Sequence, residues 1–404
     1  MAYARHLFYD AAQRPDLAAA ERIATDEVRR AVKRRADEVA AVVGLLDGLE
    51  LNDDEITVIK PPFSRARHLP SPSRAFGHLA VRDPEGFPSI TPLWVTTKDR
   101  QVVLSTVENR IKARATAVDP MAAISIAPGI GSPLGVEVCG LVMQSPDEGN
   151  ALIREIAELY SNPGMRVHAD GNYTSWDRRE GNRRIRLDLI AYQVTNELGD
   201  ESRARFAPWM RHIEGRSIQP SHLLEGRACA PDTFWEEDRL PADELELLGT
   251  KDELAILGYA REGSEFRSVN STYGHIAVHD EFGRLRARRI GFDVTAIGGE
   301  ARITFLVPKE NVAVGAGTPV ATSFAKYKIG GAWLQARGIV ELHDDSHLIE
   351  QVVRRLKHRY GRPPHDFALR FGSLHADSDF TVASIACQKL SSRYREALRS
   401  GSYS

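Results

Sequence analysis

One ten-residue motif occurs twice in this chain, first as GHLAVRDPEG from Gly77 and again as GHIAVHDEFG from Gly274, which lies 197 residues later. A second pair of matched positions has nearly the same spacing, because Gly140 in GLVM returns as Gly338 in GIVEL. A repeat of this length predicts two copies of one fold in tandem. Positions at which the two copies differ then indicate where a ligand binds.

The composition limits the class of protein. With 404 residues, of which 42% are hydrophobic, the chain can form two or three globular domains. Its net charge of −2 and pI near 6.7 give no general attraction to nucleic acid or to an anionic membrane. The three cysteines form no CxxC pair, and the N-terminal residues contain neither an apolar stretch nor a cleavage site. We therefore predict a cytoplasmic protein that binds neither nucleic acid nor membranes.

The sequence predicts four segments. Residues 1–60 are expected to be an N-terminal helical segment, because residues 15–46 are mostly strong helix formers. The two repeats are expected as domains at residues 61–198 and 256–404. Residues 199–255 connect them, and their aromatic residues predict that the connector packs against one or both domains.

The first repeat has the pattern of antiparallel strands with one helix. Apolar and polar residues alternate in the strands, and residues 83–86, Asp-Pro-Glu-Gly, have the sequence of a type I hairpin turn. Six strands and one helix are expected, at residues 78–82, 89–97, 101–106, 122–127, 136–143, 146–160 (the helix) and 184–194. This order predicts an α+β fold built from small closed or half-closed barrels. Within the last strand, AYQ at residues 191–193 aligns with ACQ at residues 386–388 of the second repeat.

The run from Gly86 to Pro120, GFPSITPLWVTTKDRQVVLSTVENRIKARATAVDP, resembles a known family. It contains a turn glycine with a proline two residues on, a P-x-W strand, and an S/T-x-x-x-R-x-K segment that leads into a short helix. These features resemble the pyridoxamine 5′-phosphate oxidase-like proteins, which are FMN-binding split β-barrels. The resemblance covers residues 76–195 and, more weakly, 273–390. It implies two tandem split β-barrel domains, each an antiparallel six-stranded barrel.

Polar and basic residues gather where the short helix, expected at residues 111–118, begins. Two hydroxyls at the end of a strand are followed by an amide and two cations, namely Ser105, Thr106, Asn109, Arg110 and Lys112. Hydroxyls, cations and the free N–H groups of a helix N-terminus form an anion site that suits a phosphate monoester. The resemblance implies that these residues bind the phosphate of FMN.

Upstream of this cluster, Thr91, Pro92 and Trp94 match the strand that borders the isoalloxazine ring in the family. The alternative is that Arg110 and Lys112 only flank a solvated helix start, and that Trp94 fills a core. This alternative explains any one of these residues taken alone. The match of the whole run to the family pattern, at the right spacing, favours a cofactor site.

The second repeat differs at this place. Nothing in residues 311–317 replaces the two cations of the first repeat. The preceding strand, RLRARR, is strongly basic, and its Arg288 aligns with Thr91, where oxidases of the family carry a phosphate-binding arginine. Arg288 is therefore a candidate cofactor ligand. The alternative is an exposed basic edge strand that discourages aggregation.

The resemblance also implies how the copies associate. Family members dimerise, and each flavin lies in a groove between two barrels. A tandem chain can form this pair from its own halves as an intramolecular pseudo-dimer, and a homodimer of the whole chain is a further option. We expect one retained cofactor groove, with the second groove degenerate or used for substrate.

Two histidine-containing features are candidates for other chemistry. His78 and His275 occupy equivalent strand positions, and the family includes heme-binding barrels, but a strand histidine is more often packed. The run HDDSH at residues 343–347 lies at a helix start, where capping is a better explanation than metal binding. No metal site is predicted.

The sequence therefore favours an FMN-dependent oxidoreductase that acts on a small organic substrate. One alternative is a reductase that uses the deazaflavin coenzyme F420, because the P-x-W strand also resembles family members that use it. Another is a non-catalytic protein that binds heme or flavin. No residue can be named as a catalytic acid or base.

Overall fold

The computed structural model describes most of both repeats. The residues described are 34, 37, 40–41, 43–60, 76–83, 86–108, 110–127, 134–160, 183–198, 201–208, 259–262, 265–268, 273–280, 283–298, 300–309, 314–326, 332–361, 363–369, 371 and 379–392. Asn109, most of the predicted N-terminal helical segment and most of the 199–255 connector lie outside these residues.

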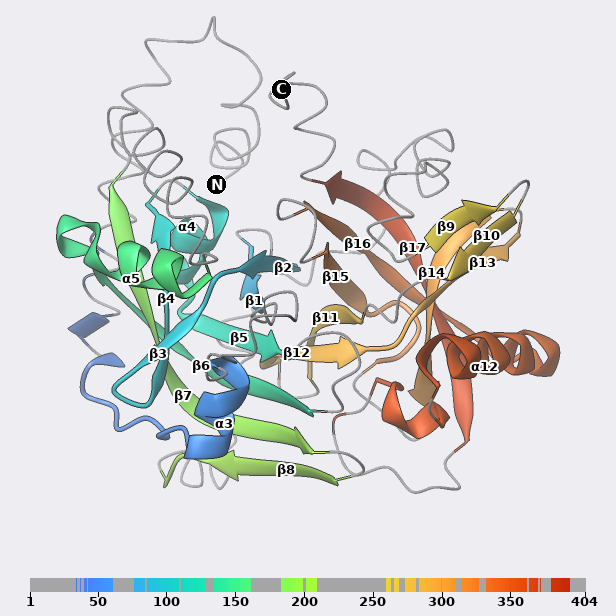
Figure 1. The fold of residues 1–404 in the computed structure, drawn as a ribbon, viewed down its shortest axis with the longest axis horizontal. Helices are drawn as coiled ribbons and strands as arrows, with labels where there is room; N and C mark the ends of the chain where they lie inside the picture. The colour runs from blue at the N-terminus through green and yellow to red at the C-terminus, as the bar shows by residue number, and fades with distance from the viewer. Residues whose placement is uncertain are drawn as a thin grey trace, which may run out of the picture.

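The first repeat forms an eight-stranded antiparallel sheet, drawn from blue to green in Figure 1. Seven of its strands follow the order β2-β1-β5-β6-β7-β4-β3, and β8 pairs with β7 outside this path. The strands are β1 (Gly77–Arg82), β2 (Pro88–Leu93), β3 (Thr96–Lys98), β4 (Gln101–Val107), β5 (Met121–Ile126), β6 (Leu134–Pro146), β7 (Arg184–Leu198) and β8 (Glu201–Phe206).

The second repeat forms a seven-stranded sheet in the order β12-β11-β15-β16-β17-β14-β13, which is the order of the first sheet strand for strand. Its strands are β11 (Gly274–His279), β12 (Leu285–Ile290), β13 (Asp293–Ile297), β14 (Glu300–Pro308), β15 (Pro319–Lys326), β16 (Ala332–His343) and β17 (Phe380–Ser392). A separate hairpin is formed by β9 (Tyr259–Glu262) and β10 (Glu265–Ser268). The shared order agrees with two copies of one fold, while a duplication as its origin stays a prediction.

The sheets differ from the expected six-stranded barrels. The strand expected at residues 89–97 is interrupted at Trp94 and Val95, so that it becomes β2 and β3. These two strands are the opposite ends of the strand order, and they are joined through the chain rather than by ladder hydrogen bonds. In the second repeat, Gly291 and Phe292 join β12 to β13 in the same way. Closure of a hydrogen-bonded barrel is therefore not found among the described residues.

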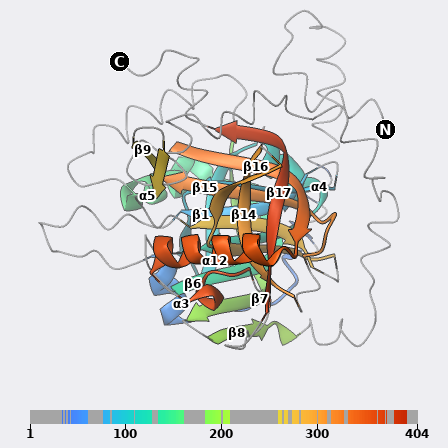
Figure 2. The same ribbon diagram turned by 90° about the vertical axis from the view of Figure 1, so that its right-hand side faces the viewer.

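The helices cover the outer sides of the two sheets. A one-turn 3-10 helix (Glu148–Asn150) leads into α5 (Ala151–Tyr160), which contacts β4 at the far end of the first repeat. In the second repeat, α12 (Ser346–Tyr360) contacts β13, β14 and β17, and Figure 2 shows it lying across the second sheet. Asp345 caps α12 by accepting a hydrogen bond from Leu348 N (2.9 Å), so the capping role predicted for the 343–347 run is confirmed. A 3-10 turn (Pro364–Asp366) follows this helix.

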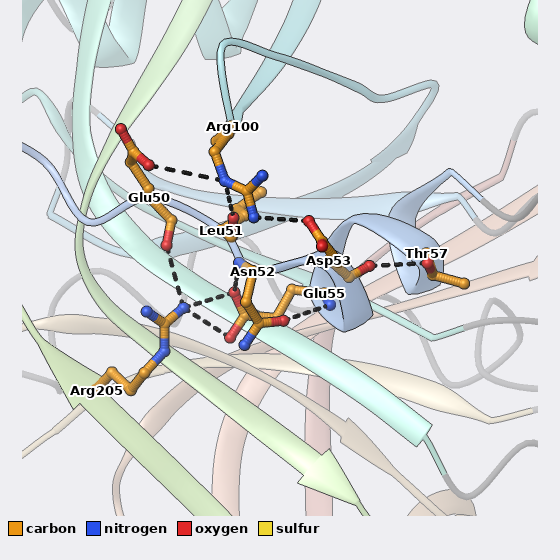
Figure 3. A network of polar contacts seen from close by, with 8 residues as sticks. All are labelled: Glu50, Leu51, Asn52, Asp53, Glu55, Thr57, Arg100 and Arg205. Atoms are coloured by element: carbon orange, nitrogen blue, oxygen red, sulfur yellow. Dashed lines mark hydrogen bonds and ion pairs between the residues drawn. The ribbon is translucent and has the colours of Figure 1, made fainter.

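A short helix near the end of the predicted N-terminal helical segment, α3 (Asp53–Ile59), lies beyond the helix formers at residues 15–46 and is fixed to the first sheet by a polar network (Figure 3). Asn52 and Glu55 form a capping box at its N-terminus. Glu55 is buried and also accepts from Arg205 of β8 (2.6 Å), while Arg100 donates to Leu51 O (2.7 Å). Of the predicted N-terminal helix, helical residues are described only between positions 34 and 43.

Each repeat has its own apolar core, and a third cluster lies between the repeats. The third cluster consists mainly of small side chains: Ala80, Ile90, Ala123, Cys139, Tyr192, Ala207, Ala277, Leu285, Ala287 and Ala321. Strand β2 contacts β11 and β15, and in the reverse sense β12 contacts β1 and β5. The contact is therefore close to isologous, with equivalent strands exchanging places. Among the described residues, no helix is long and apolar enough to cross a bilayer.

The repeated glycines mark equivalent bulges. The register between β6 and β7 shifts at Gly140, and that between β16 and β17 shifts at Gly338. Gly140 pairs with Ala191 and Gly338 pairs with Cys387, so equivalent positions in the closing strand lie 196 residues apart. The alignment of residues 191–193 with 386–388 is therefore wrong by one residue. It matched similar residue types, whereas the position of the bulge aligns Ala191 with Cys387.

Replacing Gly338 by alanine should destabilise the second repeat. A Cβ at this position would lie 2.1 Å from Ala386 O, a backbone atom that cannot move aside. We expect a loss of about 1–3 kcal/mol in the free energy of unfolding, measured by urea titration. Gly315→Ala is the matched control, because its Cβ would meet nothing within 4 Å. Equal effects of the two changes would contradict the bulge argument.

Candidate functional site

Helix α4 (Ile111–Val118) follows β4 directly and packs against β1. Its bounds are those predicted from the sequence. Gln144 of β6 fixes the helix to the sheet, because its amide donates to Ala113 O and to Thr116 Oγ1, both at 2.7 Å. The inner side of α4 carries small buried residues, which permit close packing. The helix start is thus held in place by the barrel strands.

The N-terminus of α4 lacks an acceptor from its own cap. Arg110 is the N-cap residue, its backbone is extended, and its side chain makes no capping hydrogen bond. An arginine can only donate, whereas common N-cap side chains accept from first-turn N–H groups. The first turn also contains no acidic residue. This helix end therefore combines the positive end of the helix dipole with a cation, an arrangement that favours a bound anion.

Lys112 adds a second cation in the first turn. Its side chain is half-buried. Burial and the nearby charge of Arg110 lower the pKa of Lys112 from 10.5 to about 8. An anion placed between the two cations would reverse both effects, since it would stabilise the charged ammonium. The first repeat therefore has the cation pair that the sequence predicted.

Ser105 and Thr106 point to opposite faces of β4, as successive strand residues must. Ser105 donates to Asp147 Oδ2 (2.9 Å), and the same carboxylate caps α5 by accepting from Leu152 N (2.9 Å). Thr106 is buried on the face of Leu104, whose cluster includes Ala115 of α4. One phosphate therefore cannot meet both hydroxyls from the same side, and Thr106 is the one that faces α4.

The three residues predicted to border the flavin ring separate into two environments. Trp94 packs against Val103, Leu152 and Ile156 under α5, which is the core-filling alternative. Thr91 and Pro92 are half-buried on β2, the edge strand that contacts β15 and β16 of the second repeat. Only Thr91 and Pro92 therefore lie where the two repeats meet.

The exposed-edge alternative for Arg288 needs correction, whereas its role as a cofactor ligand stays a prediction. The side chain is 2% exposed, so β12 is not an exposed basic edge at this position. Its Nε lies 3.1 Å from Glu137 Oε2 of the first repeat, so its charge is engaged by a protein carboxylate. Arg286 of the same strand forms a second ion pair with Glu137 (2.7 Å). The ion-pair partner of Arg288 belongs to the other repeat. An alignment of equivalent positions in the two repeats does not show contacts between them.

Sequence analysis missed Glu137 and Asp147. A signal for Glu137 was present, because it is a lone carboxylate in the otherwise apolar run LGVEVCGLVM, and a buried charge requires a partner. Asp147 had a weaker signal as an acid directly before a predicted helix. Both residues matter here because one neutralises Arg288 and the other binds Ser105.

The second repeat has no helix at the described positions that match the end of α4. Residues 314–318 form turns before β15 begins. Thr318 Oγ1 accepts from Gly315 N (3.0 Å) within these turns. Residues 310–313, which match the start of α4, lie outside the described part of the chain.

His78 and His275 stack on each other where the two sheets meet. Their ring centroids are 3.7 Å apart with an interplanar angle of 9°. His275 Nδ1 is hydrogen bonded to Ser125 Oγ (2.9 Å). Burial lowers the pKa of His78 to about 3, and burial with the neighbouring His78 and Arg289 lowers that of His275 well below its usual value. This arrangement favours the packed alternative over heme ligation, since no ligand plane fits between the rings.

A metal centre is not indicated by the part of the chain that the structure describes. No group of three or more His, Cys, Asp or Glu side chains is placed there to hold an ion. His343 Nε2 is instead hydrogen bonded to Ser384 Oγ (2.7 Å).

Comparison with known proteins gives only distant similarities. No protein-family model and no curated protein matches the chain. Solved structures that match include an F420 reductase, at 18% identity and a TM-score of 0.24, covering 34% of this chain and 93% of that one. General stress protein 26 from Bacillus anthracis matches at 12% identity and a TM-score of 0.25, covering 38% and 97% of the two chains.

A third match is a protein from Clostridium acetobutylicum related to general stress protein 26 and described as pyridoxinephosphate oxidase family. It is 11% identical, with a TM-score of 0.23, and covers 32% of this chain and 84% of that one. The family named there is the one that the sequence resembles. At these values the likeness assigns neither a family nor an activity to this chain.

Lys112→Met should stabilise the ligand-free protein. Below pH 8 the lysine is charged in both the folded and the unfolded chain, and the folded state carries the cost of its burial. The cost diminishes as the pH rises from about 8 towards 10.5, because the folded protein then releases the proton first. We expect the thermal midpoint at pH 7 to rise by a few degrees, and the gain to shrink at pH 9.5. The exposed Lys98→Met should change neither midpoint; a gain equal to that of Lys112→Met would refute this explanation.

The stacked histidines should make the fold sensitive to mild acid. Between pH 6.5 and about 3 the unfolded chain binds protons that the folded His78 refuses, so stability falls with pH by about 1.4 kcal/mol per unit for each such histidine. Urea unfolding between pH 7 and 5 measures this slope. His78→Gln combined with His275→Gln should flatten it, while exposed His358→Gln should leave it unchanged. An unaltered slope in the double variant would show that the pair is not the cause.

Proposed function

We propose that this chain is a flavin-dependent oxidoreductase that binds the phosphate of FMN at the N-terminus of α4 and acts on a small organic substrate in the cytoplasm. The observation that carries the proposal is the cation pair of Arg110 and Lys112 at a helix end without a side-chain cap. A phosphate dianion matches this pair in charge and in its need for several donors. The resemblance of the run from Gly86 to Pro120 supports FMN as the molecule that carries the phosphate.

The residues present fit a phosphate group. Arg110 can donate through its planar guanidinium, Lys112 can add a point charge, and the first-turn N–H groups of α4 point in the same direction. Thr106 adds a hydroxyl on the face turned to α4. Ser105 has a positioning role in this proposal, because its hydroxyl holds the Asp147 cap of α5.

Thr91 and Pro92 would border the flavin ring from the edge strand β2, and Trp94 would support this strand from behind. Bound FMN would supply the exchange of a hydride with the substrate. The chain's own residues would bind the phosphate, fix the ring at the boundary of the two repeats and limit access of water. No acid or base is assigned to the protein.

We infer that the two repeats act as an intramolecular pseudo-dimer with one cofactor per chain. Two observations support this: equivalent strands exchange places across the contact, and no cation in residues 311–317 of the second repeat replaces Arg110 or Lys112. A further homodimer of the whole chain would add a second cofactor per particle without changing this ratio.

The deazaflavin F420 is the second candidate cofactor, favoured by the sequence Pro92-Leu93-Trp94 at the proposed ring site. A non-catalytic heme or flavin carrier is the third candidate. The absorption spectrum of the reconstituted protein separates them, because oxidised flavin, deazaflavin and heme absorb at different wavelengths. No chromophore after reconstitution with any of the three would refute all of these readings.

The phosphate site is tested by comparing FMN with riboflavin, which lacks the phosphate. Wild-type protein should bind FMN far more tightly, as measured by quenching of flavin fluorescence. Arg110→Ala with Lys112→Ala should weaken FMN binding by about 100-fold or more, since each charge-assisted hydrogen bond contributes roughly 1.5–3 kcal/mol. Riboflavin binding should change little.

Lys98→Ala serves as the matched control, because Lys98 is exposed and lies on β3, outside α4. It should bind FMN as the wild type does. If the double variant keeps the preference of the wild type for FMN over riboflavin, the phosphate is bound elsewhere and the proposal is wrong.

A further inference from the structure

A single carboxylate interrupts the apolar face of β6 where the first repeat meets the second. Glu137 is 2% exposed, and Cys139, the next residue on the same face of the strand, is 0% exposed and belongs to the cluster between the repeats. A buried carboxylate is strongly unfavourable unless charged or polar groups surround it. The partners of Glu137 must therefore come from whatever packs against β6.

In the part of the chain that the structure describes, the partners of this carboxylate come from β12 of the second repeat. Arg286 donates from Nε to Oε1 (3.0 Å) and from its terminal nitrogen to Oε2 (2.7 Å), which is a bidentate pair. Ala287 N donates to Oε1 (3.0 Å), and Arg288 Nε lies 3.1 Å from Oε2. Together they lower the pKa of Glu137 to about 2 against the opposing effect of burial.

Two guanidinium groups and a backbone N–H that converge on one point are the donor set of an anion site. Both guanidinium groups also lie against the ring of Phe371, with 5.0 Å and 5.8 Å from the guanidinium carbons of Arg286 and Arg288 to the ring centroid. A second carboxylate, Asp280, lies 3.8 Å from Arg286. The arginines are thus held in place by groups other than Glu137.

On the other side of the contact, the positions equivalent to Glu137, Arg286 and Arg288 carry no charge, and the counterpart of Asp280, Asp83, is paired with Arg337 instead (2.8 Å). Arg288 pairs with Ile276 as Thr91 pairs with Leu79, so these two positions correspond. The counterpart of Glu137 is Gln335, whose amide donates to Ile90 O of the first repeat. Where one side has a carboxylate bound by two arginines, the other therefore has a neutral amide bound to the backbone.

We propose that Glu137 is a built-in ligand: its carboxylate fills an anion site formed by Arg286, Arg288 and Ala287 N–H, and so keeps small anions of solution out of this site between the two repeats. The ligands excluded are carboxylates and inorganic phosphate, the classes that this donor set would bind. The inference concerns residues other than those of the proposed FMN phosphate site and does not depend on that site.

The test is chemical rescue of a variant that lacks the carboxylate. Glu137→Ala leaves the two arginines with space for a small anion, so its thermal midpoint should fall and then rise again as acetate, formate or inorganic phosphate is added. A bound ligand raises the midpoint by mass action, roughly in proportion to the logarithm of its concentration above its Kd. Sodium chloride at equal ionic strength should not reproduce the rise. The measurements are made with Arg110→Ala and Lys112→Ala also present, so that both cations of the α4 site are removed.

Glu137→Gln is the matched control, because the amide fills the same space without a charge and should block rescue. Glu137→Ala with Arg288→Ala should also show no rescue, since the site is then incomplete. The proposal is overturned if acetate and phosphate raise the midpoint of the Glu137→Ala variant no more than chloride does, or if they raise that of Glu137→Gln equally. If Glu137→Ala does not stay folded in chloride buffer, the yield of folded protein after refolding in acetate or phosphate gives the same comparison.

Discussion

The close contact between the two sheets is the constraint on which the other features depend. Small side chains on both sheets, above all alanines of β1, β5, β11, β12 and β15, allow the backbones to approach. Side chains of one repeat can then reach the main chain of the other, as Glu137 reaches Ala287 N and Gln335 reaches Ile90 O. The stacking of His78 on His275 at 3.7 Å requires the same proximity. Larger residues in this layer would separate the repeats and remove all of these contacts.

Much of the fold could be predicted from the sequence, because it depends on local patterns. The alternation of apolar and polar residues predicted the strands. The internal repeat implied that the two sheets share one strand order, as they do. Patterns of this kind do not show where a strand bends, so the division at Trp94 and Val95 was not foreseen. Helix α3 has only seven residues and is stabilised by Arg205, a partner far away in the sequence, which no local pattern indicates.

The candidate site could be predicted only as far as its residues are neighbours in the chain. Arg110 and Lys112 lie two residues apart at a helix start, and the structure keeps them together. Ser105 and Thr106 should already have been assigned to opposite faces, since the period of a strand is two. Arg288 could not be assigned without the structure, because its environment depends on Glu137 in the other repeat and on the pairing of two separate sheets.

The difference between Glu137 and Gln335 has a genetic consequence. In an assembly of two identical chains, one substitution changes both equivalent places at once. Here the two places are encoded separately on one chain. A mutation can therefore alter one place while selection retains the other, and the two sides of the contact can diverge one codon at a time.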